Sequence, residues 1–419
     1  MIDRAVRKIS RRLLWFLLIL YAFSYLDRIN IGFAALSMNH DLRLSSTQFG
    51  AANTIFYLGY ILCEIPSNLM LARYGARLWL PRIMITWGIA SAATMFATSA
   101  TSLYSIRALV GLAEGGFFPG VLLYLTLWFP KAHRAKANAL FMIAQPLTIA
   151  TGAFLSGFIL SWNNPFGLAR WRILFLVEGL PSVILGIVAY FYLTNKPEDA
   201  KWLTAAEKEE LARSLEPAVR GQPTPWSEIL SRQVILLSLA YFGMIMTLNT
   251  IATWTPQIVG EIVKEHSYRS IGLLTALPAL IAALSMPLWS AHSDRTKERA
   301  WHIVMPMALA AVGWIFVASF TLPDLRMLGL VFCSAGGFTA MSVLWTVPQA
   351  LLSPAARPAG IAFISSCGIL ASMVTPLLIG FLRDLTHSFV AGLLFLALAL
   401  IGASTLVLSS VKREDPAPL

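Results

Sequence analysis

The sequence predicts an all-α membrane protein in which twelve transmembrane helices form two pseudo-symmetric six-helix bundles. Three observations predict this fold class. Only 13% of the 419 residues are charged and 57% are hydrophobic, whereas a soluble domain carries about 25% charged residues. Apolar segments long enough to cross a hydrocarbon core of about 30 Å recur along the whole chain. An internal repeat divides these segments into two sets of six.

The apolar segments must be helices, because lipid offers no partners for exposed backbone polar groups. The twelve expected spans cover residues 13–35, 47–71, 78–98, 101–127, 138–161, 171–194, 233–259, 268–291, 301–321, 325–348, 359–381 and 388–410.

The longest polar stretch, residues 195–232, separates the first six spans from the last six. Thr204 and Glu207 have the spacing of a capping box, which predicts a short surface helix. Prolines then follow at 217, 223 and 225 and indicate a linker. We therefore expect an N-terminal bundle over 1–194, a cytoplasmic linker over 195–232 and a C-terminal bundle over 233–419.

The two halves resemble each other at a nearly constant offset. The loop residue Arg73 maps onto Arg295 at an offset of 222, and the Gly-Gly-Phe run at 115–117 maps onto 336–338 at an offset of 221. Paired six-helix halves that enclose a site at the membrane midplane are a recurring plan among transporters.

The basic residues that give the net charge of +11 are distributed unequally between the two sides of the membrane. If the N-terminus is cytoplasmic, 23 of the 32 Lys and Arg residues fall on the cytoplasmic side and 7 on the other side. This asymmetry is the positive-inside signal. We therefore expect a multi-pass protein of the bacterial inner membrane, with both termini cytoplasmic and basic residues near lipid, and no nucleic-acid partner. The first apolar run is too long and too charged for a cleaved signal peptide.

The cysteines and histidines suggest neither a disulfide framework nor a metal site. Cys63, Cys333 and Cys367 all lie within spans, and the six histidines lie in loops or near span ends. We expect no cofactor other than protons as the coupling ion. The same absence of clustered ligands disfavours a membrane-embedded transferase, and the linker is too short for the output domain of a nutrient sensor.

A few ionisable residues lie inside the spans, where each costs roughly 2.5–3.5 kcal/mol at a helix centre. They are Asp27, Arg28, Glu64, Arg107, Glu114 and Glu178.

Four of these charges are expected to share a depth band. Asp27 and Arg28 lie about 21 Å into the first span. The fourth span runs in the opposite direction, and Arg107 lies about 9 Å and Glu114 about 20 Å from its start. Arg107 is seven residues before Glu114, close to two helical turns, so both project from one face. We expect the two pairs to face a common cavity.

The charges of that cavity suggest proton-coupled anion uptake. With both acids ionised the four charges cancel, and with both acids protonated two guanidinium groups remain free for an anion. Arg suits this role because its planar fork binds a carboxylate bidentately and stays protonated. The alternative is that the four charges form two structural ion pairs between spans 1 and 4.

The repeat offset assigns different chemistry to the two halves. Asp27 maps onto Asn249, and Glu114 maps onto Ala335. We therefore expect the N-terminal half to bind the substrate carboxylate and the protons. The C-terminal half is expected to contact hydroxyl groups or rings of the substrate. Polar or aromatic side chains near mid-span that we consider as substrate contacts are Tyr25, Tyr57, Gln145, Asn249, Thr253, Trp254, Trp345, Ser365 and Ser366. Glu178 is interpreted as structural.

Two loops resemble the signature loop of the major facilitator superfamily. They are "NLMLARYGAR" at 68–77 and "SAHSDRTKER" at 290–299. The first copy departs from the pattern, since Asn68 replaces a glycine and Ala72 replaces the acid, whereas the second keeps Asp294 and Arg295. We expect a cytoplasmic gate formed by Glu64, Arg73, Arg77, Asp294 and Arg295.

Five stretches together resemble the anion:cation symporter family within that superfamily: "YLDRINIG", "EIPSNLML", "RALVGLAEGGFFPG", "KPEDAKWLT" and "SDRTKER". The resemblance implies that Asp27 and Glu114 take part in proton coupling and that Arg28 and Arg107 bind the substrate carboxylate. It also implies polar contacts from Tyr57 and Gln145.

The family pattern "INS" in span 11 is replaced by "ISS" at 364–366, and a second expected Asn is Ile369. A less amide-rich pocket favours a compact hydroxy-dicarboxylate such as tartrate, or an aromatic acid, over a large polyhydroxylated sugar acid. We therefore expect a monomeric symporter for protons and a small organic anion. An anion exchanger or uniporter for an aromatic or sugar acid (hydroxyphenylacetate, phthalate or galactonate) is the alternative.

Overall fold

The computed structural model describes residues 2–130, 133, 137, 141, 143–162, 167–215, 225–263, 267–353 and 355–410, with Pro358 described by its backbone alone. Within these residues all regular secondary structure is helical, which confirms the predicted class. The helices are α1 (Ile2–Ile9), η1 (Ser10–Leu14), α2 (Trp15–Asp41), α3 (Ser46–Tyr74), α4 (Ala76–Ala93), η2 (Thr94–Phe96), α5 (Ala100–Glu114), α6 (Phe117–Trp128), α8 (Ala144–Ser161), α9 (Arg170–Tyr192), η3 (Pro197–Asp199), α10 (Ala205–Ser214), α11 (Trp226–Ile229), α12 (Arg232–Val263), α13 (Tyr268–Thr296), α14 (Ala300–Ser319), α15 (Pro323–Leu344), α16 (Val347–Leu351), α17 (Arg357–Thr386) and α18 (Val390–Ser410).

Each of the twelve predicted spans coincides with one of these helices or with a consecutive pair. In the described part of the chain, eleven helical segments are long and apolar enough to cross a membrane. The twelfth predicted span corresponds to α4 and η2, in which Arg77 and Arg82 lower the mean hydropathy. In predicted span 5, residues 138–140 and 142 lie outside the described residues.

The chain divides into two compact units. Unit 1 comprises Met1–Asn30, Ile55–Thr148 and Gly167–Gly221, and unit 2 comprises Ile31–Thr54, Ile149–Phe166 and Gln222–Leu419. Unit 2 therefore contains two pieces from the N-terminal half of the sequence, which pack with the C-terminal helices.

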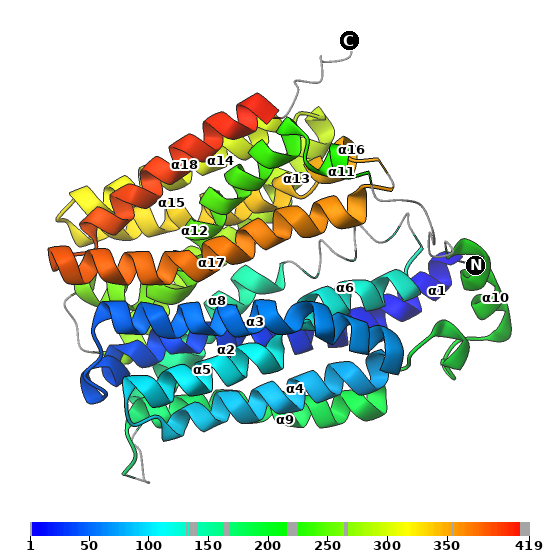
Figure 1. Cartoon of the computed structure of the whole chain (residues 1–419), viewed down its shortest axis with the longest axis horizontal. Helices are drawn as coiled ribbons and strands as arrows, with labels where there is room; N and C mark the ends of the chain where they lie inside the picture. Colours follow the sequence, from blue (N-terminus) through cyan, green and yellow to red (C-terminus); the bar gives the residue numbers. More distant parts are fainter. Residues whose placement is uncertain are drawn as a thin grey trace. The chain divides into compact units, whose positions relative to one another are not determined.

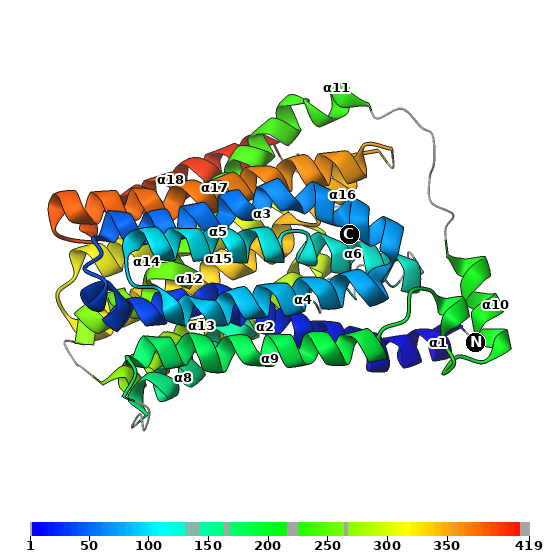
Figure 2. The same cartoon turned by 60° about the horizontal axis from the view of Figure 1, so that its bottom comes forward.

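Glycines allow the helices of unit 1 to pack closely. Helices α4 and α9 lie side by side in both views (Figures 1 and 2). At Gly88, an added Cβ would lie 2.9 Å from the backbone nitrogen of Val183. Helices α3 and α5 approach even more closely, since a Cβ on Gly111 would lie 2.0 Å from the carbonyl oxygen of Phe56. Small residues at such crossings are the usual device for packing helices in membranes.

The fourth predicted span is interrupted at Gly115 and Gly116, where α5 ends and α6 begins. Gly116 has a φ of 90°, a conformation that residues with a Cβ rarely adopt. The interruption directly follows Glu114, so it fixes the position of that carboxylate at the end of α5.

In unit 2, α14 packs against α15 and α18, and α12 packs against α17 and α18 (Figure 1). The contact between α14 and α15 again depends on glycine, because a Cβ on Gly313 would lie 2.5 Å from the carbonyl oxygen of Gly329.

The polar stretch between the halves contains the predicted surface helix, α10. Thr204 and Glu207 form the capping box that their spacing predicts. Glu207 also binds the Lys8 ammonium at 2.7 Å, although its own side chain is only 4% exposed. The ring of Trp202 stacks on that of Trp128 with 5.6 Å between centroids. These contacts attach α10 to α1 and α6 within unit 1.

Candidate functional site

An ion pair between α2 and α5 lies inside unit 1. Arg28 Nη2 lies 2.5 Å from Glu114 Oε1, and Ser24 Oγ donates to the same oxygen at 2.9 Å. Ser24 is one helical turn before Arg28, so both reach Glu114 from one face of α2. Glu114 is 1% exposed, and the side chain of Arg28 is 20% exposed. The structure therefore brings together two of the four charges for which the sequence predicts a common cavity.

Arg107 is buried close to this pair but has unused hydrogen-bond donors. Its guanidinium lies over the ring of Phe56, 4.6 Å from the centroid, and the residue is 1% exposed. Its Nε and Nη2 have no hydrogen-bond partner. Leaving charged donors buried and unpaired is costly. A ligand that accepts from these nitrogens would remove that cost.

Aromatic side chains surround Arg28. Its guanidinium lies 5.2 Å from the ring centroid of Tyr60, 5.5 Å from that of Phe56 and 5.9 Å from that of Tyr25. Such rings stabilise a cation through their electron-rich faces. Tyr57, a predicted substrate contact, is next to Phe56, with 5.1 Å between their ring centroids.

Gln145 of α8 belongs to the same neighbourhood. Its Nε2 donates to the hydroxyl of Tyr21 at 2.5 Å. The Tyr21 ring stacks on Phe141 at 4.4 Å and contacts Tyr25 at 6.2 Å between centroids. The predicted polar contact from Gln145 is thus placed beside the aromatic rings that surround Arg28.

Asp27 points to a different set of helices. Its Oδ2 accepts from Trp87 Nε1 at 2.8 Å and from Ser182 Oγ at 2.6 Å, and its Oδ1 accepts from Ser91 Oγ at 2.8 Å. Trp87 and Ser91 belong to α4, and Ser182 belongs to α9. Asp27 is 2% exposed, and among the described residues it forms no ion pair. Asp27 and Arg28, although adjacent in the chain, therefore have different partners.

Sequence reasoning missed several side chains at the site. Ser24 was missed although it lies one turn from Arg28 in the same stretch. Asn30, in "YLDRINIG", is fully buried, and its two amide atoms have no hydrogen-bond partner. Trp87, Ser91 and Ser182 gave no signal, because serine and tryptophan are common in membrane helices and the pairing of α4 with α9 is not visible in the sequence.

Six further predicted contacts lie in unit 2: Asn249, Thr253, Trp254, Trp345, Ser365 and Ser366. Thr253 and Trp254 of α12 are buried, and Ser366 of α17 is exposed. Asn249 of α12 is 5% exposed. Trp345 follows α15 and contacts Tyr241 edge-to-face, with 5.1 Å between ring centroids. Ser365 lies on α17 and is half-buried. Their association with Arg28 and Arg107 stays a prediction, since those arginines belong to the other unit.

The residues expected at the cytoplasmic gate have other partners. In unit 1, Arg77 Nε donates to the carbonyl oxygen of Tyr190 at 3.2 Å, and the Arg73 guanidinium lies over the ring of Tyr74 at 5.5 Å. Glu64 is half-buried and forms no ion pair with either arginine in the described structure.

In unit 2, Asp294 pairs with Arg299 at 2.7 Å, and Arg295 is exposed. The role of these five residues as a gate stays a prediction. Glu178, interpreted as structural, is 1% exposed on α9. The three cysteines are free, and the described residues contain no group of three or more His, Cys, Asp or Glu side chains that could hold a metal ion.

Comparison with known proteins identifies the family. The model of the family described as "Major Facilitator Superfamily" matches residues 17–354. A protein of Agrobacterium vitis with the name "Putative tartrate transporter" is 44% identical over 418 residues, which cover 98% of this chain and 96% of the relative. The "Inner membrane transport protein RhmT" of Escherichia coli (strain K12) is 31% identical, and the match covers 99% of this chain and 97% of that protein.

A solved structure shares the fold. The structure described as "Crystal structure of D-xylose-proton symporter" superposes with a TM-score of 0.78 at 15% identity, covering 98% of this chain and 99% of the other. The relatives are transporters, which confirms the expectation that the chain is not an enzyme. The multi-pass helices, the family match over most of the chain and the shared fold establish that this protein is a transporter of the major facilitator superfamily and resembles its organic-anion permeases.

Proposed function

We propose that the protein is a proton-coupled symporter that imports a small organic acid anion by alternating access, and that the anion is a hydroxy-dicarboxylate such as tartrate. It acts as a monomer of the anion:cation symporter type in a bacterial inner membrane, with both termini cytoplasmic. The observation that carries the proposal is the buried Arg107 guanidinium, whose Nε and Nη2 have no acceptor. A substrate carboxylate would supply one.

The ion pair between Arg28 and Glu114 provides a route for coupling. While Glu114 is ionised, it occupies the guanidinium of Arg28. A proton on Glu114 removes the charge that holds this pair together and frees Arg28 for the anion. Two arginines can then bind one carboxylate group each, or both can bind a single carboxylate. Proton binding and anion binding thus favour each other at adjacent residues.

Asp27 is the second proton carrier in this proposal. Its carboxylate is held by donors on α4 and α9, so a change in its charge acts on the packing of α2 against those helices. Protonation of Glu114 would thus favour anion binding at Arg28. Protonation of Asp27 would change how α2 packs against α4 and α9, and so the conformation of unit 1.

The proposed substrate rests on two observations. A relative that is 44% identical over nearly the whole chain carries the name of a tartrate transporter. Two arginines within one unit also suit an anion with two carboxylates. The aromatic rings around Arg28 favour a second candidate, an exchanger or uniporter for an aromatic acid such as hydroxyphenylacetate or phthalate, or for the sugar acid galactonate.

Uptake into proteoliposomes tests the proposal. With an acidic exterior, radiolabelled tartrate should accumulate against its gradient, and dissipating the pH gradient with a protonophore should abolish the accumulation. Asp27→Asn should abolish proton-driven uptake but spare exchange between labelled and unlabelled anion. The control is Asp324→Asn, because Asp324 is an exposed acid at the start of α15. Undiminished pH-driven uptake by Asp27→Asn would contradict the role of Asp27.

A thermal-shift screen of the purified protein distinguishes the candidate substrates. Dicarboxylates with four carbons, aromatic acids and sugar acids are tested at equal concentration. A ligand present at 100 times its dissociation constant stabilises the folded state by about 2.7 kcal/mol. Stabilisation by aromatic acids alone would replace tartrate by the second candidate.

A further inference from the structure

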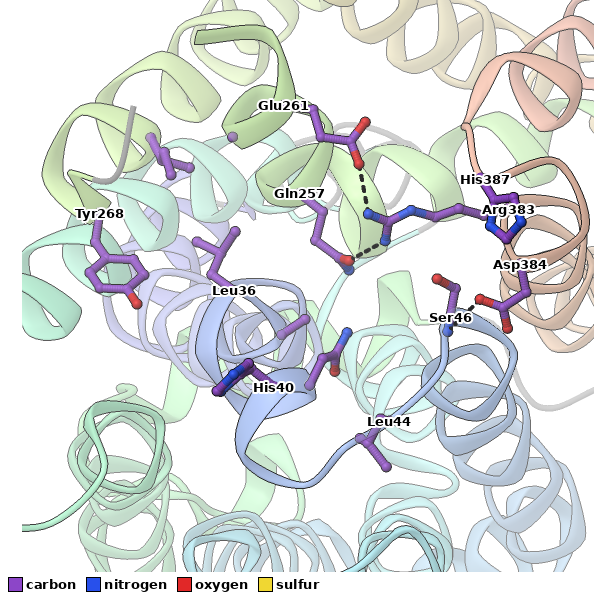
Figure 3. A pocket seen from close by; sticks show the side chains of 14 residues that line it. Leu36, His40, Leu44, Ser46, Gln257, Glu261, Tyr268, Arg383, Asp384 and His387 are labelled. Atoms are coloured by element: carbon purple, nitrogen blue, oxygen red, sulfur yellow. Dashed lines mark hydrogen bonds and ion pairs between the residues drawn. The ribbon is translucent and has the colours of Figure 1, made fainter. Parts of the chain in front are cut away.

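The first turn of α3 is capped by an acid from a distant helix of unit 2. Asp384, near the end of α17, accepts from the backbone nitrogen of Ser46 at 2.9 Å and from that of Thr47 at 2.7 Å. It also accepts from the Thr47 hydroxyl at 2.6 Å. Figure 3 shows Asp384 facing Ser46. The contact joins residues that are more than 330 positions apart in the chain.

This geometry is favourable for physical reasons. The first N–H groups of a helix have no partner within the helix, and the positive end of the helix dipole stabilises a nearby anion. Capping is normally provided by a residue next to the helix in sequence. At α3, Ser45 provides this local cap, because its hydroxyl accepts from the backbone nitrogen of Gln48 at 3.2 Å. Asp384 adds a second cap from α17, so its bonds to the start of α3 also hold the two helices together.

The capped end is also the place where the two helices approach most closely. A Cβ on Gly380 would lie 2.2 Å from the carbonyl oxygen of Ser46, and one on Gly50 would lie 2.2 Å from that of Pro376. The hydroxyl of Thr54 donates to the carbonyl oxygen of Met373 at 2.6 Å. The first turns of α3 therefore lie directly on the backbone of α17.

The neighbouring residue, Arg383, connects α17 to a third helix. Its guanidinium donates to Gln257 Oε1 at 2.9 Å and to Glu261 Oε1 at 2.6 Å, both on α12. Arg383 and Asp384 thus bind α12 and α3 from one end of α17.

These side chains line a cavity of about 950 Å³ in unit 2, together with residues of α2 and α13 (Figure 3). The charged groups of Arg383, Glu261 and Asp384 are bound to protein partners. The cavity is therefore better explained as a vestibule bordered by these contacts than as a site with charges ready for a ligand.

We infer that Asp384 is the latch of the external gate: its bonds to the start of α3 hold residues 31–54 on the C-terminal helices, and these bonds must break before substrate enters from outside. The inference rests on the proposed function for its orientation, because cytoplasmic termini place the ends of α2, α12 and α17 outside. Transport from outside requires this segment of the N-terminal half to leave α17, and the cap is the most polar part of the contact.

Cysteine labelling tests the latch without measuring transport. The three native cysteines are replaced, and Ala35→Cys places one thiol at the cavity, where Ala35 is 5% exposed. A membrane-impermeant maleimide is added to right-side-out and to inside-out vesicles. Asp384→Asn should raise the labelling rate in right-side-out vesicles about tenfold, which is typical of the loss of a charge-assisted contact at a helix terminus. Asp324→Asn is the matched control.

A second pair of variants, with smaller changes, allows the test to be made even if Asp384→Asn misfolds. Thr47→Val removes the hydroxyl that donates to Asp384, whereas Thr47→Ser keeps it, so only the first should increase labelling. An unchanged rate in both Asp384→Asn and Thr47→Val would overturn the latch. Faster labelling confined to inside-out vesicles would overturn its external position. Faster labelling from outside in a protein that accumulates no tartrate would support the latch and reject the proposed substrate.

Discussion

Asp27 and Arg28 are neighbours in the chain, yet their side chains bind different helices. Arg28 pairs with Glu114 of α5, whereas Asp27 accepts from Trp87 and Ser91 of α4 and from Ser182 of α9. Adjacent residues on a helix project about 100° apart, which accounts for the divergence. One short stretch of α2 therefore connects the ion pair with Glu114 to the packing of two other helices.

Arg107→Lys should weaken anion binding strongly while leaving expression intact. An ammonium is a single point charge and cannot reproduce the planar, bidentate fork. Charge-assisted hydrogen bonds contribute about 1.5–3 kcal/mol, so affinity should fall by a factor of about 10 to 150. The measurement is ligand-induced thermal stabilisation, with the exposed Arg232 replaced by Lys as the control. Near-normal affinity would refute the assignment of Arg107.

Ser91→Ala and Ser182→Ala should each destabilise the protein. Each change removes one donor from a buried carboxylate and leaves that oxygen less satisfied. We expect a loss of about 1–2 kcal/mol in the free energy of unfolding for each. Unfolding in detergent measures the effect. Ser366→Ala is the control, because that exposed hydroxyl donates only to the carbonyl of Ala362 in its own helix. Equal stability of all three variants would show that the donors to Asp27 do not matter.

Gly111→Leu should prevent correct packing of α3 against α5. Its Cβ would lie 2.0 Å from the carbonyl oxygen of Phe56, closer than any real contact, and backbone would have to move. Gly402→Leu on α18 is the matched control, because no atom lies within 4 Å of a Cβ added there. Size-exclusion profiles and thermal unfolding should separate the two variants. Similar behaviour would contradict the close crossing.

The attachment of α10 to α1 should weaken in acid. The hydrogen bond from Lys8 and the backbone hydrogen bond from Thr204 hold the pKa of Glu207 below its ordinary value of 4.5. A depressed folded-state pKa means that the contribution to stability is fully present above about pH 4.5 and is lost as the pH falls through the folded value. The protection of α10 amides from hydrogen exchange, taken relative to the intrinsic exchange rate at each pH, should therefore fall below pH 4.5. Glu207→Gln should show faster exchange already at pH 7, and Glu209→Gln, an exposed neighbour, should not.

Much of the fold was predictable from the sequence, because backbone polar groups in lipid must form hydrogen bonds within the protein. A segment of about 20 apolar residues has to be a helix, so each of the twelve predicted spans coincides with a helix or a consecutive pair of helices in the described part of the chain. The capping box at Thr204 was visible because it depends on residues close in sequence. Depth along the spans suggested that Arg28 and Glu114 face a common cavity, but not that they pair with each other.

The remaining features depend on contacts between distant parts of the chain. Nothing local indicates that Ser182 lies beside Asp27, or that Asp384 caps α3, since each pair is separated by more than 150 residues. Assignment of Ile31–Thr54 to unit 2 also depends on tertiary packing, whereas sequence reasoning divided the protein only at the linker.

The attachment of α10 has a mechanical consequence for the two halves. Fully extended, the whole 195–232 stretch would reach roughly 130 Å, far more than any rocking motion needs. Unit 1 holds α10 through Glu207, and unit 2 holds α11, because Glu228 accepts from the backbone nitrogen and the hydroxyl of Ser353 at 3.1 and 3.0 Å. Only about ten peptide units then separate Leu215 from Pro225, and their fully extended length is at most about 36 Å. The covalent connection thus sets an upper limit on how far its two anchor points can move apart during a transport cycle.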